Sequence, residues 1–375
     1  MSAAVKMPAT VSRIAVLRAN ALGDYIFCIP ALEALKHAWP DAELVYLGNA
    51  WHRDFIAGRP GPVDRVVTIP EYKGIPHGND DGGDSHAVNQ FFARMRAESF
   101  DLAFQMHGGG GHSNPFVRRL RARLSIGMQA ENAPPLDVNI PYVPYHNEVL
   151  RYIEIAKVAG ADPVTVEPHL AVTARDHHEL HAALPDLRHP YVVLHPGASD
   201  ARRRWSTARM AVIADMLAAN GLHVYVTGVK EEEDICESLV GHARSTPTSV
   251  CARLSLSAMT ALLAQAELVV SNDTGPLHLA RALGTRTVGT YWVGNTINAG
   301  LVSCRGNRIC MSWTTTCPQC GMDCIRHDAH VPRNGCDHAV SFLDSIAVEE
   351  VWSQVEALLA CGSAVSSAAA AGVPG

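Results

Sequence analysis

Short apolar runs rich in β-branched residues alternate with helical stretches along this chain of 375 residues, and the alternation occurs twice. In the first half we expect a strand at 13–18, a helix at 31–40 and a strand at 42–48. In the second half we expect strands at 191–197, 223–228, 266–273 and 287–292, with helices at 206–220, 231–242 and 276–283. Strands that alternate with helices build parallel sheets. The pattern therefore predicts an α/β chain of two similar halves, and the length also exceeds what one hydrophobic core usually supports.

The expected domain boundaries lie where this alternation is interrupted. We expect an N-terminal domain over residues 1–175 and a C-terminal domain over 188–345, which includes a Cys-rich segment over 304–336. Residues 346–360 have helical periodicity and predict a C-terminal helix. The low-complexity residues 361–375 predict a flexible tail.

The composition excludes several classes of protein. Hydrophobic residues make up 47% and charged residues 18% of the chain, which fits a globular protein with sizeable cores. The net charge of −6 argues against nucleic-acid binding through bulk charge. No run reaches the roughly 18–20 apolar residues of a membrane span, and no signal-peptide stretch is present. We therefore expect a cytoplasmic protein without a transmembrane segment.

The first strand-to-helix turn comes after strand 13–18. Ligands of open α/β sheets bind beyond the carboxyl ends of strands, so such turns are candidate sites. Gly23 permits a tight turn, and Asp24 then falls at the start of the next helix. A carboxylate there fits two interpretations, which are a helix cap worth about 0.5–2 kcal/mol and a general base that faces a ligand.

The second turn, 194-LHPGASDARRRWS-206, consists of small residues and then three arginines. Its backbone N–H groups can approach an anion. The arginines are either a solvated surface or the counter-charge of a diphosphate. The candidate ligands of a nucleotide here are His195, Gly197, Ala198, Ser199, Arg203 and Arg204.

The third turn, 227-TGVKEEED-234, places three glutamates after a strand. Acidic residues suit the first turn of a helix because the helix dipole favours anions there. One of them could also accept hydrogen bonds from a nucleoside. Gly228, Glu231 and Glu232 are therefore candidates, with the choice among the glutamates left open.

The fourth turn, 271-SNDTGPLHLARALGT-285, is the most specific. A buried strand stops at Asp273, Thr274 and Gly275 form the turn, and Pro276 suits the first helical position. The free N–H groups of Thr274, Gly275 and Leu277 then predict a phosphate cradle. His278 either donates to a phosphate oxygen or packs as a partly buried histidine. The chain has no GxGxxG after a strand and no GxxxxGK[ST], so it is not an obvious nicotinamide enzyme or P-loop NTPase.

In the first half, 104-FQMHGGGGHSNPFVRRL-120 contains a glycine run that lets a substrate approach the backbone. The candidate contacts to a substrate are His107, Gly108, Ser113 and Asn114. Arginines come next at 118, 119, 121 and 123 and form either a basic substrate-binding surface or a solvated helix face.

Six of the ten cysteines lie between Cys304 and Cys336. Four of them, with the spacing C-x2-C-x3-C-x11-C, are Cys317, Cys320, Cys324 and Cys336. Four thiolates at this spacing fit a closed structural zinc or iron site, for which His327, His330 and His338 are substitute ligands. The alternative is a set of reduced, packed cysteines or one disulfide. The other cysteines are expected to pack as small apolar residues.

Several of these motifs, in this order and over most of the chain, resemble the lipopolysaccharide heptosyltransferases of glycosyltransferase family 9. They are ALGDYIFCIPALEALK, VVLHPGAS and then RRW, VTG with its glutamates, and VVSNDTGPLHLARALGT. The resemblance implies a GT-B fold, in which two Rossmann-like domains face a central cleft. The N-terminal half would bind the acceptor and the C-terminal half the nucleotide sugar, and the last helix would cross back to the first domain.

The resemblance also implies inverting transfer from ADP-L-glycero-D-manno-heptose without a catalytic cofactor. Asp24 would be the general base, and backbone donors from Thr274 to Leu277 with an arginine would stabilise the leaving diphosphate. The family usually has a lysine where this chain has Arg203. Asp273 would orient the turn or contact the sugar, and some relatives carry a Cys-ligated iron.

We therefore predict an inverting glycosyltransferase that moves heptose from ADP-heptose to a hydroxyl of a glycan, such as the lipopolysaccharide core, or of a protein. The alternatives are a GT-B-like sugar-nucleotide epimerase or hydrolase, and a non-catalytic protein that binds nucleotide sugars. Peripheral contact with the inner membrane and the oligomeric state are left open.

Overall fold

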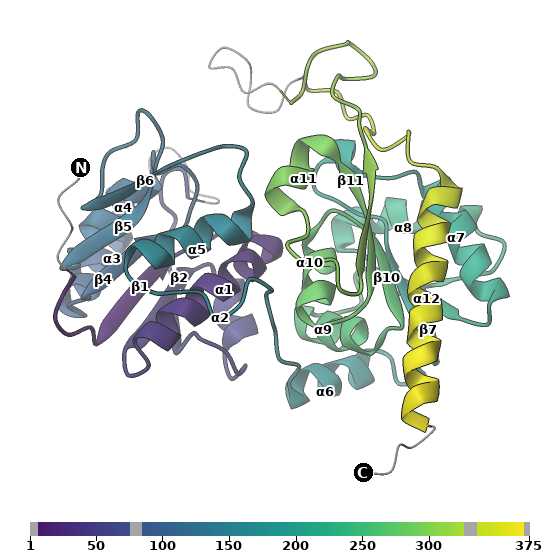
Figure 1. Cartoon of the computed structure of the whole chain (residues 1–375), viewed down its shortest axis with the longest axis horizontal. Helices are drawn as coiled ribbons and strands as arrows, with labels where there is room; N and C mark the ends of the chain where they lie inside the picture. The colour runs from purple at the N-terminus through teal and green to yellow at the C-terminus, as the bar shows by residue number, and fades with distance from the viewer. Residues whose placement is uncertain (1–6, 76–84, 326–335, 371–375) are drawn as a thin grey trace. The chain divides into compact units, whose positions relative to one another are not determined.

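The computed structural model describes residues 7–75, 85–325 and 336–370, the last nine by their backbone alone. The chain divides into two compact units, residues 1–171 and 172–375. Each unit contains a six-stranded sheet whose strand pairs are all parallel, with helices packed around it (Figure 1). The predicted class, two Rossmann-like α/β units with parallel sheets, is confirmed. None of the described helices is long and apolar enough to cross a membrane.

The sheet of the first unit has the strand order β3-β2-β1-β4-β5-β6. Its strands are β1 (Arg13–Leu17), β2 (Glu43–Gly48), β3 (Arg65–Thr68), β4 (Leu102–Gln105), β5 (Leu124–Gln129) and β6 (Val138–Pro141). Its helices are α1 (Leu22–Ala38), α2 (Ala50–Ile56), α3 (His86–Ala97), α4 (Ser113–Arg119) and α5 (Glu148–Val158). The strand order reverses direction between β1 and β4, and we call this place the first switch point.

The sheet of the second unit has the order β12-β11-β10-β7-β8-β9, which is the same arrangement of six consecutive strands. Its strands are β7 (Tyr191–His195), β8 (His223–Val226), β9 (Thr248–Ser249), β10 (Leu268–Asn272), β11 (Thr287–Trp292) and β12 (Asn307–Ser312). Its helices are α6 (Ala174–Ala183), α7 (Thr207–Ala219), α8 (Glu233–His242), α9 (Leu256–Gln265), α10 (Gly275–Ala282), α11 (Val293–Ala299) and α12 (Val348–Ala370). The second switch point lies between β7 and β10.

The linker region divides differently from the expected boundaries. Helix α6 packs on α9 and belongs to the second unit, which therefore begins at residue 172. Helix α1 also begins at Leu22 instead of after Pro30, because the helix continues through this proline. A proline removes one helical hydrogen bond, and here the surrounding core retains the helix despite that loss.

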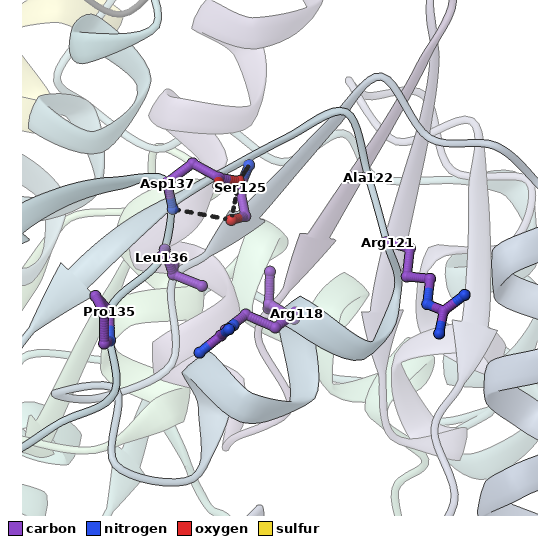
Figure 2. Close-up of a pocket in the computed structure, with 8 residues that line it drawn as sticks. Arg118, Arg121, Ala122, Ser125, Pro135, Leu136 and Asp137 are labelled. Atoms are coloured by element: carbon purple, nitrogen blue, oxygen red, sulfur yellow. Dashed lines mark hydrogen bonds between the residues drawn. The ribbon is translucent and has the colours of Figure 1, made fainter.

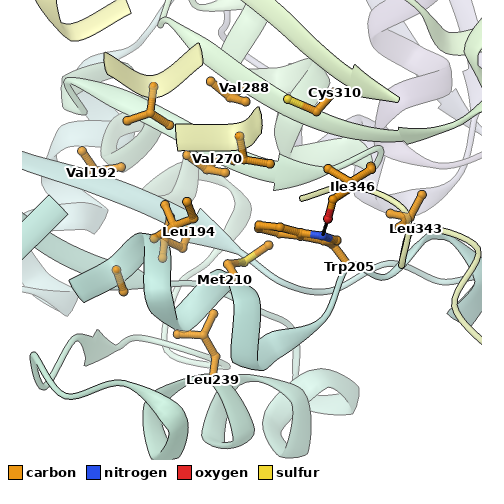
Figure 3. Packing of buried hydrophobic residues seen from close by; sticks show 14 of the residues in the cluster. Val192, Leu194, Trp205, Met210, Leu239, Val270, Val288, Cys310, Leu343 and Ile346 are labelled. Atoms are coloured by element: carbon orange, nitrogen blue, oxygen red, sulfur yellow. Dashed lines mark hydrogen bonds between the residues drawn. The ribbon is translucent and has the colours of Figure 1, made fainter. Parts of the chain in front are cut away.

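The core of the second unit surrounds Trp205, which is 1% exposed and packs with Leu194, Met210 and Val270 (Figure 3). The indole Nε1 donates a hydrogen bond to the carbonyl oxygen of Ile346 at 3.1 Å, which ties the segment before α12 to this core.

Helix α12 contributes Val351, Val355 and Leu358 to the same core and so packs on the second unit. The helix extends to Ala370, beyond the predicted 346–360, because its alanine-rich end favours helix. The predicted tail is thus helical as far as Ala370, and residues 371–375 lie outside the described part. The expected crossing of this helix to the first domain stays a prediction.

Candidate active site at the switch points of the two sheets

Most of the residues predicted to bind the nucleotide sugar, together with Asp24 and His107, lie at the two switch points. Open α/β sheets bind ligands beyond the carboxyl ends of the strands, at the place where the strand order reverses. In the first unit, Asp24 lies after β1 and His107 lies after β4. In the second unit, the turn after His195 of β7 neighbours the turn at Asp273, after β10.

Asp24 lies in the first turn of α1, where both of its carboxylate oxygens accept hydrogen bonds. The backbone N–H of Ala21 donates to Oδ2 at 2.9 Å, and Nη2 of Arg18 donates to Oδ1 at 2.5 Å. The Asp24 side chain keeps 28% exposure, whereas that of Arg18 keeps 5%. Asp24 therefore caps the helix and remains partly exposed. Gly23 lies within α1, so residues 18–21 make the turn that we had assigned to this glycine.

Arg18 was not predicted as a site residue. It ends the first predicted strand, and a charged residue at the end of an apolar run is the signal that could have marked it. Its second nitrogen, Nη1, donates to the carbonyl oxygen of Met106 at 2.9 Å. Arg18 thereby links the loop after β1 to the loop after β4.

His107 is held in one tautomer at the first switch point. The backbone N–H of Ala19 donates to its Nδ1 at 3.2 Å, so the proton of the neutral ring lies on Nε2. Burial, reinforced by the positive charge of Arg18, lowers the pKa of His107 to about 3. His107 is therefore a neutral donor through Nε2.

Ser113 and Asn114 are buried, and their side chains form hydrogen bonds that hold the loop of glycines 108–111. We had predicted that they would contact an acceptor. The Ser113 hydroxyl donates to the carbonyl oxygen of His107 at 2.7 Å, and Gln105 donates to Ser113 at 2.6 Å. The Asn114 amide donates to the carbonyl oxygen of Met128 at 3.0 Å. Polar side chains beside a glycine run can serve the fold of the loop, and here they do. Gly108 has a φ of +63° with no atom within 4 Å of where a Cβ would lie.

The predicted basic surface is not at the first switch point. Arg118 and Arg121 line a cavity of about 320 Å³ whose wall includes Asp137 (Figure 2). This cavity lies at the amino ends of β5 and β6, the edge of the sheet opposite the switch point. The guanidinium carbon of Arg119 lies 4.1 Å from the ring centroid of Phe92, and Arg123 forms an ion pair with Asp101.

At the second switch point, the turn after β10 offers fewer free amides than predicted. Helix α10 begins at Gly275, with Pro276 as its second residue. The N–H of Leu277 donates to the carbonyl oxygen of Thr274 at 3.1 Å and is not free. In the part of the chain that the structure describes, the N–H groups of Thr274 and Gly275 have no partner. The predicted cradle therefore reduces to two amides at the start of α10.

Asp273 lies directly before this cradle and is 1% exposed. His278 Nε2 lies 3.0 Å from its Oδ1, Arg203 Nη1 lies 3.8 Å from its Oδ2, and Asn295 of α11 donates to Oδ2. Burial opposes its charge, but these contacts lower the pKa of Asp273, whereas burial lowers the pKa of His278. The pair is therefore an aspartate with a neutral histidine. Asn295 was missed, and nothing in its local sequence marks it.

The arginines connect the two turns of this switch point. Arg203 donates to the carbonyl oxygen of Asp273 at 3.1 Å and to the hydroxyl of Ser199 at 3.0 Å. Arg204 donates to the carbonyl oxygen of Ala198 at 2.8 Å. Arg203 thus lies beside the cradle, while Arg204 supports the turn after β7. Asn272, which was not among the predicted site residues, donates to the carbonyl oxygen of Pro196 at 2.6 Å and so connects the turn after β10 to the turn after β7.

The structure distinguishes the glutamates of the third turn. Glu232 is 9% exposed, whereas Glu231 is exposed. The Glu232 Oε2 accepts from the backbone of Val229 at 3.0 Å and lies 3.8 Å from Nε2 of His195, which is itself buried. Burial lowers the pKa of His195 against the opposing effect of Glu232.

Glycines make room for Glu232 and its helix. A Cβ on Gly197 would lie 2.1 Å from the Glu232 carboxylate. A Cβ on Gly228 would lie 2.6 Å from the sulfur of Cys236 at the start of α8. A side chain at Gly197 would therefore displace the Glu232 carboxylate, and one at Gly228 would displace the sulfur of Cys236.

The Cys-rich segment brings four potential metal ligands together. Their ligand atoms lie within 4.8 Å of one another, and they belong to Cys317, Cys320, Cys336 and His338. Cys324 is not among them, and its sulfur lies 3.3 Å from the carbonyl oxygen of Met322. Although burial opposes a charged Cys317, backbone amides of Cys320 and Gln319 lower its pKa to about 6. Three cysteines and one histidine form a donor set that suits zinc or iron. His327 and His330 lie outside the described residues.

Known proteins share this sequence pattern and fold. Residues 88–329 match the model of glycosyltransferase family 9 (heptosyltransferase). The lipopolysaccharide core heptosyltransferase OpsX of Haemophilus influenzae is 21% identical over 285 residues, which cover 74% of this chain and 78% of that protein. The family match favours sugar transfer over the epimerase, hydrolase and non-catalytic alternatives.

Two solved structures show the shared GT-B fold. The ADP-heptose lipopolysaccharide heptosyltransferase II of E. coli superposes with a TM-score of 0.72 at 17% identity, covering 94% of this chain and 99% of that one. TibC of enterotoxigenic E. coli, described as an iron-containing dodecameric glycosyltransferase, has a TM-score of 0.55 at 13% identity, covering 94% of this chain and 77% of that one.

Proposed function

Because this chain belongs to glycosyltransferase family 9, we propose that it transfers heptose from ADP-heptose to a hydroxyl of a lipopolysaccharide-core glycan, with inversion at the anomeric carbon. The observation that carries this proposal is that the first unit has a partly exposed carboxylate, Asp24, at its switch point, and the second unit has an amide cradle at its own switch point. A related glycan or a protein hydroxyl is the alternative acceptor. Inner-membrane contact and oligomeric state stay open.

Asp24 is the general base of this reaction. It accepts the proton of the acceptor hydroxyl while that oxygen bonds to the anomeric carbon. The bond from that carbon to the β-phosphate oxygen breaks, and its electron pair leaves with ADP. Attack from the face opposite the leaving group inverts the anomeric configuration.

The second unit holds the leaving group. Negative charge grows on the diphosphate as the bond breaks, and preorganised donors stabilise it. The N–H groups of Thr274 and Gly275 and the guanidinium of Arg203 are these donors. Glu232 binds the nucleoside, since it is the buried glutamate beside the turn after β7.

His107 and Gly108 form the acceptor side. The Nε2–H of His107 donates to the acceptor, and Gly108 lets the acceptor approach the backbone. This assignment rests on the fixed tautomer of His107 and on the shared turn at residues 19–21, which contacts both His107 and Asp24.

The test is a turnover assay with ADP-heptose and a panel of core-glycan acceptors. We expect ADP release that depends on the acceptor, and a product whose anomeric configuration by NMR is opposite to that of the donor. Release at the same rate without any acceptor would instead indicate a hydrolase, and retention of configuration would exclude the inverting mechanism.

We further propose that Cys317, Cys320, Cys336 and His338 hold a structural iron or zinc ion. The geometry of the four ligand atoms supports this site. A closed four-ligand site leaves no position for substrate, so the ion would cross-link the Cys-rich segment and take no part in transfer.

Elemental analysis of the purified protein tests the metal site. A structural site should be close to fully loaded, so less than about 0.2 metal ions per chain would contradict it. Cys317→Ser should lose the metal, whereas Cys324→Ser should keep it because Cys324 lies outside the ligand set. Loss of metal in both variants would show that Cys324 is also a metal ligand.

A further inference from the structure

Glu148, the first residue of α5, lies in a buried network that reaches Asp24 through Arg18. Its side chain is 15% exposed, and its two oxygens accept from three different groups. Arg151 donates to Oε1, and Tyr152 donates to Oε2. Arg18 Nη2, the nitrogen that also contacts Asp24, lies 3.4 Å from Oε2.

The other members of this network hold Glu148 in place. Arg151 is buried, and its Nη2 donates to the carbonyl oxygen of Val143 at 2.6 Å. The fully buried Tyr152 ring lies with its centroid 5.0 Å from the guanidinium carbon of Arg18. Two arginines thus face two carboxylates, and Glu148 is the carboxylate that connects Arg18 to α5.

Few of the ionisable groups around Asp24 carry charge near neutral pH. The groups that interact with it electrostatically are Arg18, Cys28, Tyr46, His52, His107 and Tyr152. Burial raises the pKa values of Cys28, Tyr46 and Tyr152, so these groups stay neutral. Burial lowers the pKa values of both histidines to about 3, so they stay neutral as well. Arg18 is therefore the charged member of this set, and Glu148, which also pairs with Arg151, reaches Asp24 through Arg18.

An arginine paired with a single carboxylate weakens that carboxylate as a base, because the positive charge favours the anion. At the first switch point the same guanidinium nitrogen of Arg18 faces two carboxylates. Glu148 therefore offsets part of the charge that Arg18 presents to Asp24, and it also fixes the orientation of the guanidinium.

We propose that Glu148 is a positioning residue for Asp24, which acts by sharing Arg18 and thereby keeps Asp24 both oriented and basic. The inference rests on the proposed function, because it assigns Glu148 a task only if Asp24 accepts the proton of the acceptor.

The test compares kcat, donor KM and the pH profile of kcat in the full-length wild type and in Glu148→Gln. We expect kcat to fall about 10- to 100-fold, the cost of slight misplacement of a catalytic group, with donor KM unchanged. Glu148→Gln removes the negative charge that shares Arg18, so the acid limb of the profile should move to lower pH. A role in folding alone would not move the acid limb in this direction.

Two further variants sharpen the test. Tyr152→Phe removes the hydroxyl that holds Glu148 but no charge, so kcat should fall by less and the acid limb should stay. Glu154→Gln, on the same helix with a 54% exposed side chain, is the matched control and should behave as the wild type. If Glu148→Gln does not fold, wild-type kcat in Tyr152→Phe overturns the proposal.

The outcomes separate this inference from the proposed function. If Asp24→Asn abolishes transfer while Glu148→Gln keeps the wild-type kcat and acid limb, the positioning role of Glu148 is wrong and the proposed base stands. An acid limb that moves to higher pH in Glu148→Gln also overturns the positioning role. If Asp24→Asn itself keeps near-normal turnover, the proposed base is wrong and the inference falls with it.

Discussion

At the first switch point the carboxylate of Asp24 is held by the buried cation Arg18, whereas the described part of the second switch point offers the backbone N–H groups of Thr274 and Gly275 without a protein partner. A proton acceptor is a single group whose basicity depends on the charges around it. A diphosphate spreads its charge over many oxygens. Backbone N–H groups whose positions are fixed at the start of a helix can donate to several of these oxygens. Two sheets with the same strand order therefore support different chemistry through the loops at the carboxyl ends of their strands.

The two switch points also differ in where their parts come from. At the second, the cradle, Arg203 and Asp273 lie on the loops directly after β7 and β10. At the first, Asp24 depends on Glu148, which arrives from α5, more than a hundred residues along the chain. The first site should therefore respond to changes far from it in sequence, and the second mainly to changes in its own turns.

Among changes at the second switch point, loss of the Arg203 charge beside the cradle should reduce activity the most. Arg203→Ala removes a charge from the leaving diphosphate, and we expect kcat/KM to fall about 10²- to 10³-fold. Arg203→Lys keeps a positive charge and should retain most of the activity. Steady-state kinetics with ADP-heptose measure both. Equal losses in the two variants would show that geometry, and not charge, is what Arg203 supplies.

Replacement of the buried glutamate should weaken nucleotide binding. Glu232→Ala should raise the Kd for ADP about 10- to 100-fold, the usual worth of a hydrogen bond to a charged group. Its exposed neighbour provides the control, since Glu231→Ala should leave Kd unchanged. Titration calorimetry with ADP checks this, and a larger effect for Glu231 would reverse the assignment.

At the first switch point, His107→Ala should affect only the acceptor. Loss of one neutral hydrogen bond should raise the acceptor KM about 5- to 10-fold, without any change in the affinity for ADP. The exposed His112 on the same loop provides the control variant His112→Ala. An unchanged acceptor KM in His107→Ala would remove His107 from the acceptor side.

The smallest expected effect is the contribution of His52, in the first unit, to the pH dependence of folding stability. Burial lowers the pKa of His52 from 6.5 to about 3, so between these values the unfolded chain binds a proton that the folded chain does not. Stability is therefore lost as pH falls through this range. From pH 7 to pH 5.5, His52 should account for about 1 kcal/mol of that loss. Denaturant unfolding of the wild type and of His52→Gln measures the difference, and equal pH dependence in both would contradict it.

The sequence predicted the fold well, since strand-helix alternation was sufficient for two parallel sheets. It also marked the turns of the second switch point as candidates, and in the structure Arg203 donates to the carbonyl oxygen of Asp273 in the fourth turn. Both results come from local patterns, because a turn after a strand contains its own donors. The prediction of a free amide at Leu277 was wrong, since Thr274 already accepts its proton.

The supports of the first switch point could not be predicted in the same way. Glu148 and Arg18 meet only after α5 packs on α1, and neither residue belongs to a recognisable spacing. Ser113 and Asn114 show the converse error, because polar residues beside a glycine run were taken for ligand contacts while the loop uses them for its own folding. Side-chain partners from distant elements require the tertiary structure.

The division of tasks between the two switch points is tested most directly by the Kd for ADP of Asp24→Asn, measured alongside its turnover. General-base catalysis contributes about 10²- to 10⁴-fold, so turnover should fall by that factor, while Kd stays within error of the wild type. Near-normal turnover, or a loss of ADP affinity that parallels the loss of turnover, would contradict the separation of proton acceptance in the first unit from nucleotide binding in the second.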